Sequence, residues 1–209
     1  MLPLTDSSIL LRLGKHIDPG LNQRVHSLAA RLAAHPLAGV QETVPGYTSL
    51  TVHYDPLVRT HAQVADWLSA QLAAEEQTSA PRPAHLVEIP VVYDGPDLAF
   101  VAEYCKLSIP AVIHAHSQAE YNVAMMGFLP GFPYLSGLPE QLRLPRRATP
   151  RTHVPAGSVA IAGAQAGIYP QESPGGWQLI GRTRLALHDP QRNPPFLLAP
   201  GDTVRFIPG

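Results

Sequence analysis

The segment from Gly127 to Thr183 constrains the fold of this chain more than any other part of its sequence. It is dense in Gly and Pro, whose backbone preferences are incompatible with one continuous helix. A flexible linker would normally be polar and poor in aromatic residues. Aromatic residues are instead spread along the whole segment: Phe128, Phe132, Tyr134, Tyr169 and Trp177. We therefore expect an ordered, irregular stretch that forms a binding surface.

Charge and composition narrow the class of protein. The chain has 15 Lys and Arg against 16 Asp and Glu, so its formal net charge is -1, whereas a generic nucleic-acid-binding protein is strongly basic. Its single cysteine, Cys105, permits neither an intramolecular disulfide nor a cluster of thiolate metal ligands. The N-terminus lacks the pattern of a signal peptide, and no apolar stretch approaches the roughly 18 residues of a membrane span. We expect a soluble cytoplasmic protein that acts on neither nucleic acids nor membranes.

The first part of the chain, residues 1–83, has the pattern of a small α+β domain. An apolar strand at 8–13 precedes a helix that Asp18 caps. Two strands at 37–44 and 47–54 then surround a Pro-Gly turn, and a second helix follows. The order β-α-β-β-α is most of a ferredoxin-like fold. The polar, Pro-containing stretch at the end of this part marks the predicted domain boundary.

The rest of the chain, residues 84–209, predicts an all-β barrel with short helices. A strand at 85–93 comes first, and two short helices follow, the second capped by Ser108. Beyond residue 121 the apolar runs are short and separated by Gly and Pro, which is typical of a barrel or sandwich rather than a parallel sheet. These runs are predicted strands at 121–126, 158–162, 177–180, 185–187 and 204–207.

A run of arginines inside the Gly- and Pro-rich segment is the first candidate site. Four arginines lie within nine residues with no acid among them: Arg143, Arg146, Arg147 and Arg151. The planar fork of Arg suits carboxylate or phosphate groups, and Arg182 would join the run if a barrel brings the ends of the segment together. A solvated basic loop is the alternative interpretation, because charge runs are usually exposed. The prolines within the run favour the anion site.

Glu172 lies in a second candidate site, the loop Tyr-Pro-Gln-Glu-Ser-Pro-Gly-Gly-Trp. A Glu held beside aromatic residues suits a general base or a group that binds a substrate amide. A carboxylate that caps backbone N–H groups is the alternative interpretation. Ser173 is not expected to be a nucleophile, because the G-x-S-x-G pattern is absent around it.

Motifs for metal and nucleotide binding are weak or missing. His114 and His116 are two residues apart, a spacing that does not fit ligands on one helix face, so we expect no metal site. The phosphate-binding motif G-x-x-x-x-G-K-[ST] is absent. Any ATP site is therefore unconventional or lies on a partner.

Four motifs carry a resemblance to a known family. They are GFLPGFPYL at 127–135, TPR at 149–151, VPAGSVAIAG at 154–163 and GIYPQESPGGWQLIGRT at 167–183. With the stretches at 88–98 and 197–209, they closely resemble the allophanate hydrolase subunit 1 family over nearly the whole chain. Members of that family include the B subunit of 5-oxoprolinase, to which the resemblance is greatest, and KipI.

The resemblance implies a cyclophilin-like β-barrel behind a small α+β domain, in a protein that works with partners. In the 5-oxoprolinase system, chains resembling this one act with a C-type and an A-type partner to open 5-oxoproline to glutamate with ATP hydrolysis. A similar module belongs to the carboxyltransferase part of a biotin-dependent urea carboxylase. KipI, in contrast, inhibits a sporulation histidine kinase.

From the resemblance we expect one subunit of an ATP-dependent 5-oxoprolinase, a hydrolase that is inactive without its C-like and A-like 5-oxoprolinase partners. ATP would be bound in the complex, by this chain or by a partner. One alternative is a KipI-like inhibitor of a sensor histidine kinase. The other is the carboxyltransferase lobe of a biotin-dependent urea or amide carboxylase.

The expected site takes a small amide or lactam. Glu172 is its expected catalytic residue and orients the amide, while Arg147 and Arg151 hold a carboxylate or phosphate. The other expected substrate contacts are Tyr169, Trp177 and Arg182, and the expected pocket lining is Phe128, Phe132, Tyr134 and Gln165.

Overall fold

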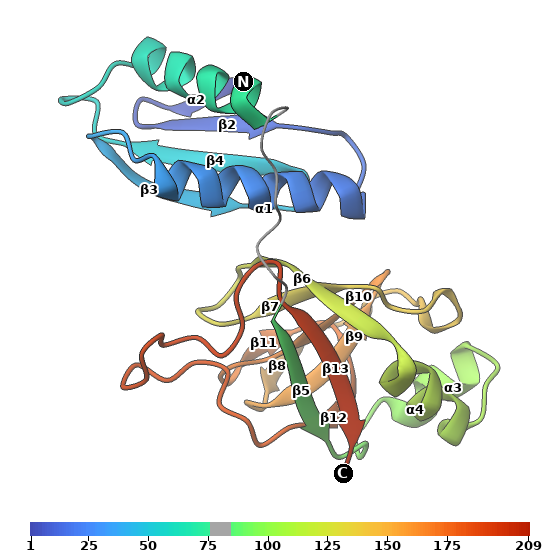
Figure 1. Cartoon of the computed structure of the whole chain (residues 1–209). Helices are drawn as coiled ribbons and strands as arrows, with labels where there is room; N and C mark the ends of the chain where they lie inside the picture. Colours follow the sequence, from blue (N-terminus) through green and yellow to red (C-terminus); the bar gives the residue numbers. More distant parts are fainter. Residues whose placement is uncertain (76–84) are drawn as a thin grey trace. The chain divides into compact units, whose positions relative to one another are not determined.

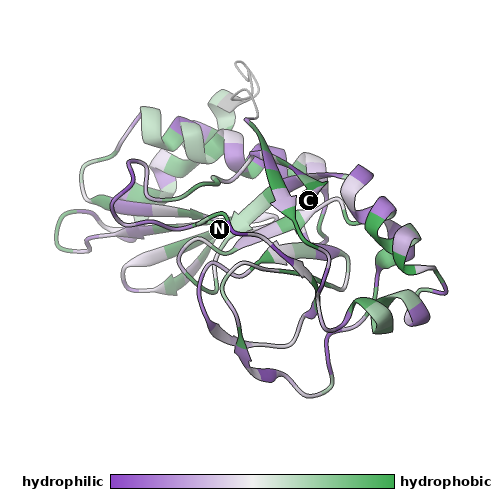
Figure 2. Cartoon of the chain, turned by 90° about the horizontal axis from the view of Figure 1, so that it is seen from below, coloured by the Kyte–Doolittle hydropathy of each residue, from purple (hydrophilic) through white to green (hydrophobic). Residues whose placement is uncertain are grey.

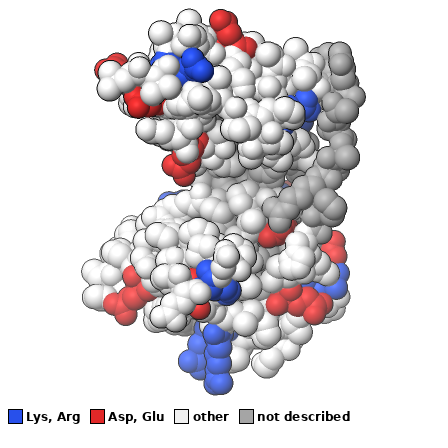
Figure 3. Space-filling view, turned by 60° about the vertical axis from the view of Figure 1, so that its left-hand side comes forward, with Lys and Arg blue, Asp and Glu red and all other residues white. Residues whose placement is uncertain are grey.

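The computed structural model describes residues 1–75 and 85–209 (Figure 1). The chain forms two compact units, Met1–Pro83 and Ala84–Gly209, and each has its own hydrophobic core. The predicted boundary between residues 83 and 84 lies outside the described residues. On the face drawn in Figure 3, uncharged residues cover most of the surface of each unit, as expected for a chain with 15% charged residues.

The first unit packs two helices against an antiparallel sheet of strand order β1-β2-β4-β3. Its elements are β1 (Leu2–Thr5), β2 (Ser8–Arg12), α1 (Pro19–Ala34), β3 (Val40–Pro45), β4 (Ser49–Tyr54) and α2 (His61–Glu75). Alternate residues of β2 and β4 face one core, so both helices cover the same face of the sheet. That core contains Ile9, Leu11, Leu50, Val52 and Tyr54 from the strands and Val25, Leu28, Leu32, Val64 and Leu68 from the helices.

The predicted element order β-α-β-β-α is present from β2 to α2. Asp18 begins α1, because its side chain accepts a hydrogen bond from the Leu21 backbone N–H at 2.8 Å. Strands β3 and β4 form the predicted hairpin, with bounds shifted by a few residues. Strand β1 is an addition that the sequence does not predict.

The second unit is built on a sheet of strand order β12-β9-β10-β7-β6-β13-β5. Its strands are β5 (Leu86–Val91), β6 (Glu120–Met126), β7 (Pro133–Ser136), β9 (Ser158–Ala162), β10 (Gln165–Ile168), β12 (Gln178–Arg182) and β13 (Thr203–Pro208). Neighbours are antiparallel except for β13 and β5. Val92, just beyond β5, and Arg182 of β12 exchange two backbone hydrogen bonds of 2.9 Å. The sheet therefore nearly closes on itself like a barrel.

Short helices and a two-stranded ribbon surround this sheet. Helix α3 (Leu98–Tyr104) contacts β12, and α4 (Ile109–Gln118) contacts β13. The 3-10 helix η1 (Glu140–Leu142) and the ribbon of β8 (Arg151–Val154) with β11 (Ser173–Gly175) complete the unit. Helices and strands carry both hydrophobic and hydrophilic residues (Figure 2). No single helix of the described residues is long and apolar enough to span a membrane; α3 and α4 together pass that test by length and composition, with a 93° bend between them.

One predicted strand of the second unit is wrong, and four observed strands are not predicted. No strand forms at 185–187, where the carbonyl of the buried Leu187 accepts a hydrogen bond from the Leu197 N–H at 2.8 Å within an irregular loop. The sequence also does not predict β7, β8, β10 and β11, because these strands are short and three of them contain Gly or Pro. The chain as a whole is a mixed α/β fold with a nearly closed, barrel-like sheet and few helices.

Candidate functional site

The Gly- and Pro-rich segment supplies most of the candidate site. Strands β7 to β12 all lie within it, so its glycines and prolines separate short strands instead of forming a linker. Gly131 and Gly157 adopt φ values of 85° and 79°, a conformation that glycine reaches without strain. The segment is therefore part of the barrel and of the ribbon beside it.

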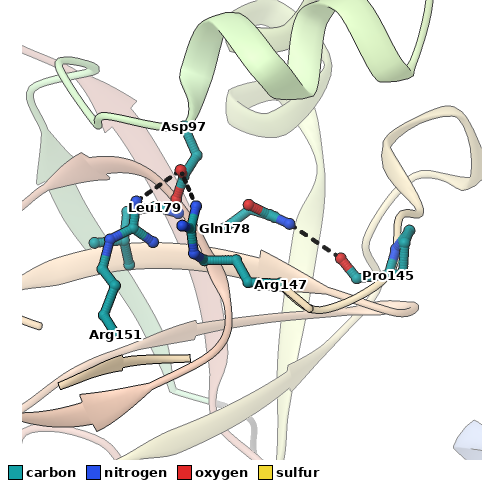
Figure 4. Close-up of polar contacts among 6 residues, drawn as sticks. All are labelled: Asp97, Pro145, Arg147, Arg151, Gln178 and Leu179. Carbon is teal, nitrogen blue, oxygen red and sulfur yellow. Dashed lines mark hydrogen bonds and ion pairs between the residues drawn. The ribbon is translucent and has the colours of Figure 1, made fainter. Parts of the chain in front are cut away.

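Asp97, at the start of α3, is the centre of a buried ionic cluster (Figure 4). Its Oδ1 accepts hydrogen bonds from Arg147 Nη1 at 3.0 Å and from Arg151 Nη2 at 2.7 Å. Its Oδ2 accepts a hydrogen bond from the Leu179 backbone N–H at 2.7 Å. The Asp97 side chain is 5% exposed, against 35% for Arg147 and 22% for Arg151. Two arginines of the predicted anion site thus meet at one carboxylate.

Hydrogen bonds fix the backbone of the arginine run against β12 and the residues just before it. The Arg147 N–H donates to the Gly176 carbonyl at 2.7 Å, and Gln178 Nε2 donates to the Pro145 carbonyl at 3.2 Å. These bonds hold Arg147 beside Asp97, and the pairing of Arg151 with Gly175 in the β8–β11 ribbon holds Arg151 there. The interpretation as a solvated loop therefore does not fit these two residues.

The other two arginines of the run lie in different surroundings. Arg143 is about half exposed and forms an ion pair of 3.7 Å with Glu140 in η1. Arg146 lies over an aromatic ring, with its Cζ 5.8 Å from the centroid of Trp177. The run therefore divides into an exposed residue, a cation over a ring and a pair bound to Asp97.

Around Asp97, positive charge exceeds negative charge, and some buried polar atoms have no hydrogen-bond partner. Two guanidinium groups face one carboxylate, which leaves one net positive charge. Among the buried side-chain atoms that the structure describes, Arg147 Nε, Arg151 Nη1 and Gln178 Oε1 have no hydrogen-bond partner. An unpaired buried polar group costs about 1–3 kcal/mol, and in native proteins it commonly marks a water or ligand site. The cluster has the charge and the donors to accept a small anion.

Phe132 is the centre of an aromatic cluster. Its ring makes edge-to-face contacts with four others, at centroid distances of 5.5 Å to Phe128, 5.0 Å to Tyr134, 5.2 Å to Tyr169 and 5.6 Å to Trp177. Phe128 is 59% exposed, whereas Phe132, Tyr169 and Trp177 are buried. Phe128 also has a φ of 68°, which is rare for a non-glycine residue and costs backbone energy. The cluster therefore presents one exposed ring at the surface, on a residue whose backbone is strained.

Tyr169 links the aromatic cluster to the arginines. Burial raises the pKa of its hydroxyl, while a hydrogen bond with the Trp177 backbone and the positive charges of Arg146 and Arg151 partly offset that rise. The hydroxyl is therefore protonated at neutral pH and can donate a hydrogen bond. Tyr169 packs against Gly175, which pairs with Arg151 across the β8–β11 ribbon, so the aromatic cluster and the arginines are neighbours.

Three predicted site residues make other contacts. Arg182, at the end of β12, forms an exposed ion pair of 2.7 Å with Asp94. Glu172 Oε1 lies 3.1 Å from His153 Nδ1, and both side chains are largely exposed. Gln165 is half-buried at the first position of β10, where it pairs with β9. None of these contacts joins the three residues to Asp97.

Sequence reasoning misses Asp97 and Gln178. Asp97 resembles a helix cap, yet its side chain makes no capping hydrogen bond, and its arginine partners lie 50 and 54 residues further along the chain. No local sequence pattern predicts a pairing between residues so far apart in the chain. Gln178 does have a signal, because it is a polar residue within an apolar predicted strand, and a buried polar side chain needs a partner. Within residues 1–75 and 85–209, no group of three His, Cys, Asp or Glu residues is placed to hold a metal ion.

Comparison with known proteins agrees with this architecture. A family model described as "Carboxyltransferase domain, subdomain C and D" matches residues 1–198. The chain is 47% identical to the 5-oxoprolinase B subunit of Escherichia coli O157:H7, over 97% of this chain and 93% of that protein. It is 43% identical to the 5-oxoprolinase B subunit of Bacillus subtilis (strain 168), over 98% of this chain and 90% of that protein.

A solved structure has the same fold. The crystal structure of TTHA0988 superimposes with a TM-score of 0.88 at 42% identity and covers 97% of this chain. The match takes up 40% of the TTHA0988 chain, so the chain spans less than half the length of that protein. By its family model and by its identity to these relatives, the chain belongs to the family of the carboxyltransferase domain, subdomain C and D, together with the B subunits of 5-oxoprolinase.

Proposed function

We propose that this chain is one subunit of an ATP-dependent 5-oxoprolinase that opens 5-oxoproline to glutamate. Identities of 47% and 43% to proteins named as the B subunit of 5-oxoprolinase, over nearly the whole length of each, support this assignment. The observation that carries it in the structure is the meeting of Arg147 and Arg151 at Asp97, beside an aromatic cluster. 5-Oxoproline is a small lactam ring with a carboxylate, so it needs a cationic group and an apolar wall.

Each predicted site residue has a role in this proposal. Arg147 and Arg151 bind the substrate carboxylate, and Tyr169 and Trp177 form the wall for the ring. Glu172, with His153 at its carboxylate, orients the amide when a partner covers this exposed face. Arg182 contributes at the rim, and the remaining lining comes from Phe128, Phe132, Tyr134 and Gln165.

The proposal also includes partners and ATP. The partners are C-like and A-like 5-oxoprolinase subunits, and ATP is bound in the complex, by this chain or by one of them. The complex is a cytoplasmic hetero-oligomer, and this chain alone is inactive. At the level of fold, we assign the first unit to the ferredoxin-like class and the second to the cyclophilin-like class.

Reconstitution tests the proposed function. The chain is mixed with its candidate partners, co-purification is measured, and ATP hydrolysis is followed with and without 5-oxoproline. We expect hydrolysis that depends on 5-oxoproline and on every member of the complex. A correctly assembled complex without that activity would contradict the proposed function.

A second candidate is the carboxyltransferase lobe of a biotin-dependent urea or amide carboxylase. The description of the matching family model favours it. It requires a partner that carries carboxylated biotin. Inhibition of the reconstituted activity by avidin would support this candidate, whereas 5-oxoproline-dependent ATP hydrolysis that avidin leaves unchanged would exclude it.

A further inference from the structure

We propose that Asp97 is the positioning residue of the substrate site and that it holds Arg147 and Arg151 so that their remaining N–H groups bind the carboxylate of the lactam. The inference rests on the proposed function. It adds a residue that shapes the site, and it selects a carboxylate over a phosphate as the bound anion.

Asp97 holds both guanidinium groups without using up their donors. Arg147 and Arg151 each give one hydrogen bond to Oδ1, out of the five N–H groups that an arginine carries. A bidentate pair with Asp97 would occupy two N–H groups of one arginine and leave the other arginine unpaired. Here both arginines keep donors, and Arg147 Nε and Arg151 Nη1 are buried without a partner. The side chains of Arg147 and Arg151 are 35% and 22% exposed, so N–H groups of both arginines other than these two buried atoms remain open to one ligand.

Asp97 is itself fixed on three sides. Its Oδ2 accepts a hydrogen bond from the Leu179 N–H at 2.7 Å, and its own N–H donates to the Leu179 carbonyl at 3.0 Å. Its carbonyl accepts a hydrogen bond from the Val101 N–H at 2.8 Å, within the first turn of α3. The carboxylate is therefore clamped between β12 and α3. Such a support keeps the binding groups in place before the ligand arrives and lowers the entropic cost of binding.

The charge of the cluster selects a monoanion. One net positive charge remains after Asp97 is counted, and the two oxygens of a carboxylate match the fork of an arginine. A phosphate offers similar oxygens with a larger negative charge. The carboxylate is favoured because Arg151 pairs across the β8–β11 ribbon with Gly175, against which Tyr169 packs. The Tyr169 ring contacts Phe132 in the aromatic cluster. A small ring that carries a carboxylate can contact the aromatic cluster and bind the arginines at the same time.

Asp97→Asn separates positioning from simple charge. The carboxylate of Asp97 accepts hydrogen bonds from three donors, whereas an amide has only one acceptor oxygen. In Asp97→Asn the two guanidinium groups are therefore no longer held in place, although the net positive charge of the cluster rises. If Asp97 positions the two arginines, the KM for 5-oxoproline should increase about tenfold in this variant, because losing a hydrogen bond to a charged group has about that effect. The kcat and the KM for ATP should stay nearly unchanged. A KM for 5-oxoproline that falls or does not move overturns the proposal. Glu140→Gln, at an exposed ion pair with Arg143, is the control that should leave all three constants unchanged.

A substrate analogue supplies a second, independent measurement. 2-Pyrrolidone has the lactam ring of 5-oxoproline and lacks the carboxylate. In calorimetry, the wild-type complex should bind 5-oxoproline at least about tenfold more tightly than 2-pyrrolidone, and the difference should shrink in Asp97→Asn and in Arg151→Lys, which keeps the charge and loses the fork. Equal affinity of the wild type for both lactams contradicts the proposal, as does a change confined to ATP, which would identify a phosphate site.

The two measurements keep the inference apart from the proposed function. Turnover of 5-oxoproline tests the function, while the calorimetric comparison tests the carboxylate site even in a complex that does not turn over. If Asp97→Asn does not fold, Arg151→Lys alone carries the binding comparison. Turnover by the wild type with no change of affinity in either variant would retain the function and remove the inference.

Discussion

Tyr169 packs so closely against Gly175 that no side chain fits at position 175. A Cβ atom placed there would overlap the Tyr169 hydroxyl oxygen and lie 2.8 Å from its Cζ. Tyr169 is buried at the centre of the candidate site. It belongs to the aromatic cluster, and the positive charge of Arg151 acts on its hydroxyl. The glycine therefore fixes the position of a side chain that lies between the aromatic cluster and Arg151.

Gly175→Ala should displace Tyr169, whereas Gly176→Ala should not. At Gly176 the nearest atom to an added Cβ is Pro150 Cγ at 3.6 Å, which is ordinary van der Waals contact. Overpacking predicts a loss of about 1–3 kcal/mol in the free energy of unfolding for Gly175→Ala, and a change below about 1 kcal/mol for its neighbour. Urea denaturation followed by fluorescence measures both. Equal stability of the two variants would contradict the assigned packing of Tyr169.

Fluorescence can be assigned to one unit of the chain. The protein has two tryptophans, Trp67 in the first unit and Trp177 in the second. A Trp67→Phe background leaves Trp177 as the reporter of the second unit. All stability measurements proposed for the second unit use this background.

Asp97→Ala should destabilise the second unit strongly. It removes the partner of Arg147 and Arg151 and leaves the Leu179 N–H unpaired. Loss of one member of a buried ion pair costs about 3–5 kcal/mol, and the partial exposure of the arginines places this case near about 3 kcal/mol. Denaturation midpoints in urea provide the measurement.

The matched control for that loss is Asp94→Ala. Asp94 pairs with Arg182 at the same 2.7 Å distance, but both side chains are exposed, so the expected cost is below about 1 kcal/mol. A similar loss in both aspartate variants would show that burial does not distinguish the two ion pairs.

Arg151→Ala should lower activity while the unit stays folded. Its guanidinium is proposed to bind the substrate carboxylate, so the kcat/KM of the reconstituted complex for 5-oxoproline should fall about tenfold or more. Arg143→Ala, from the exposed end of the same run, should keep the wild-type value. Wild-type kinetics for Arg151→Ala would remove this residue from the site.

His116 should make the second unit less stable in mild acid. Its side chain is fully buried, Nδ1 lies 2.8 Å from the Tyr93 hydroxyl, and burial lowers its pKa to about 3 from an ordinary value of 6.5. Between these two pH values the unfolded chain binds a proton that the folded chain excludes, so stability falls as the pH falls from 6.5 toward 3 and is unaffected by this group above 6.5. For this group the linkage predicts a loss of about 2 kcal/mol between pH 7 and pH 5.

Two matched variants on α4 check that sign. His116→Gln should remove about 2 kcal/mol of the pH dependence between pH 7 and pH 5, whereas His114→Gln, at an exposed position of the same helix, should keep the wild-type slope. Unfolding free energies at a series of pH values give both slopes. An unchanged slope in His116→Gln would contradict the buried neutral state.

Local patterns in the sequence carry much of the fold. Caps at Asp18 and Ser108 begin helices where the sequence predicts them, because a cap acts within three residues of the helix start. The apolar run at 158–162 is β9, a strand buried along its whole length. By contrast, β7, β8, β10 and β11 of the same Gly- and Pro-rich segment are only three or four residues long, and pairing with strands further along the chain defines most of them. Such pairing has no local signature.

The candidate site, like the fold, is predicted where its residues lie close together in the sequence and missed where they do not. Aromatic residues and arginines in an ordered segment point to it, and the structure joins Phe132, Tyr169 and Trp177 in one cluster and Arg147 with Arg151 in another. The residue that joins the arginines, Asp97, lies outside that segment, so no reading of the segment alone includes it. Glu172 and Arg182 remain predictions, because their contacts in this chain are with exposed partners.

Formation of glutamate from 5-oxoproline decides whether this chain is a subunit of a 5-oxoprolinase. This chain is assembled with its C-like and A-like partners, supplied with ATP, and compared with the same mixture lacking this chain. We expect glutamate only in the complete mixture, with ATP consumed alongside it. Glutamate formed at the same rate without this chain, or no glutamate from the complete complex, would contradict the proposed function.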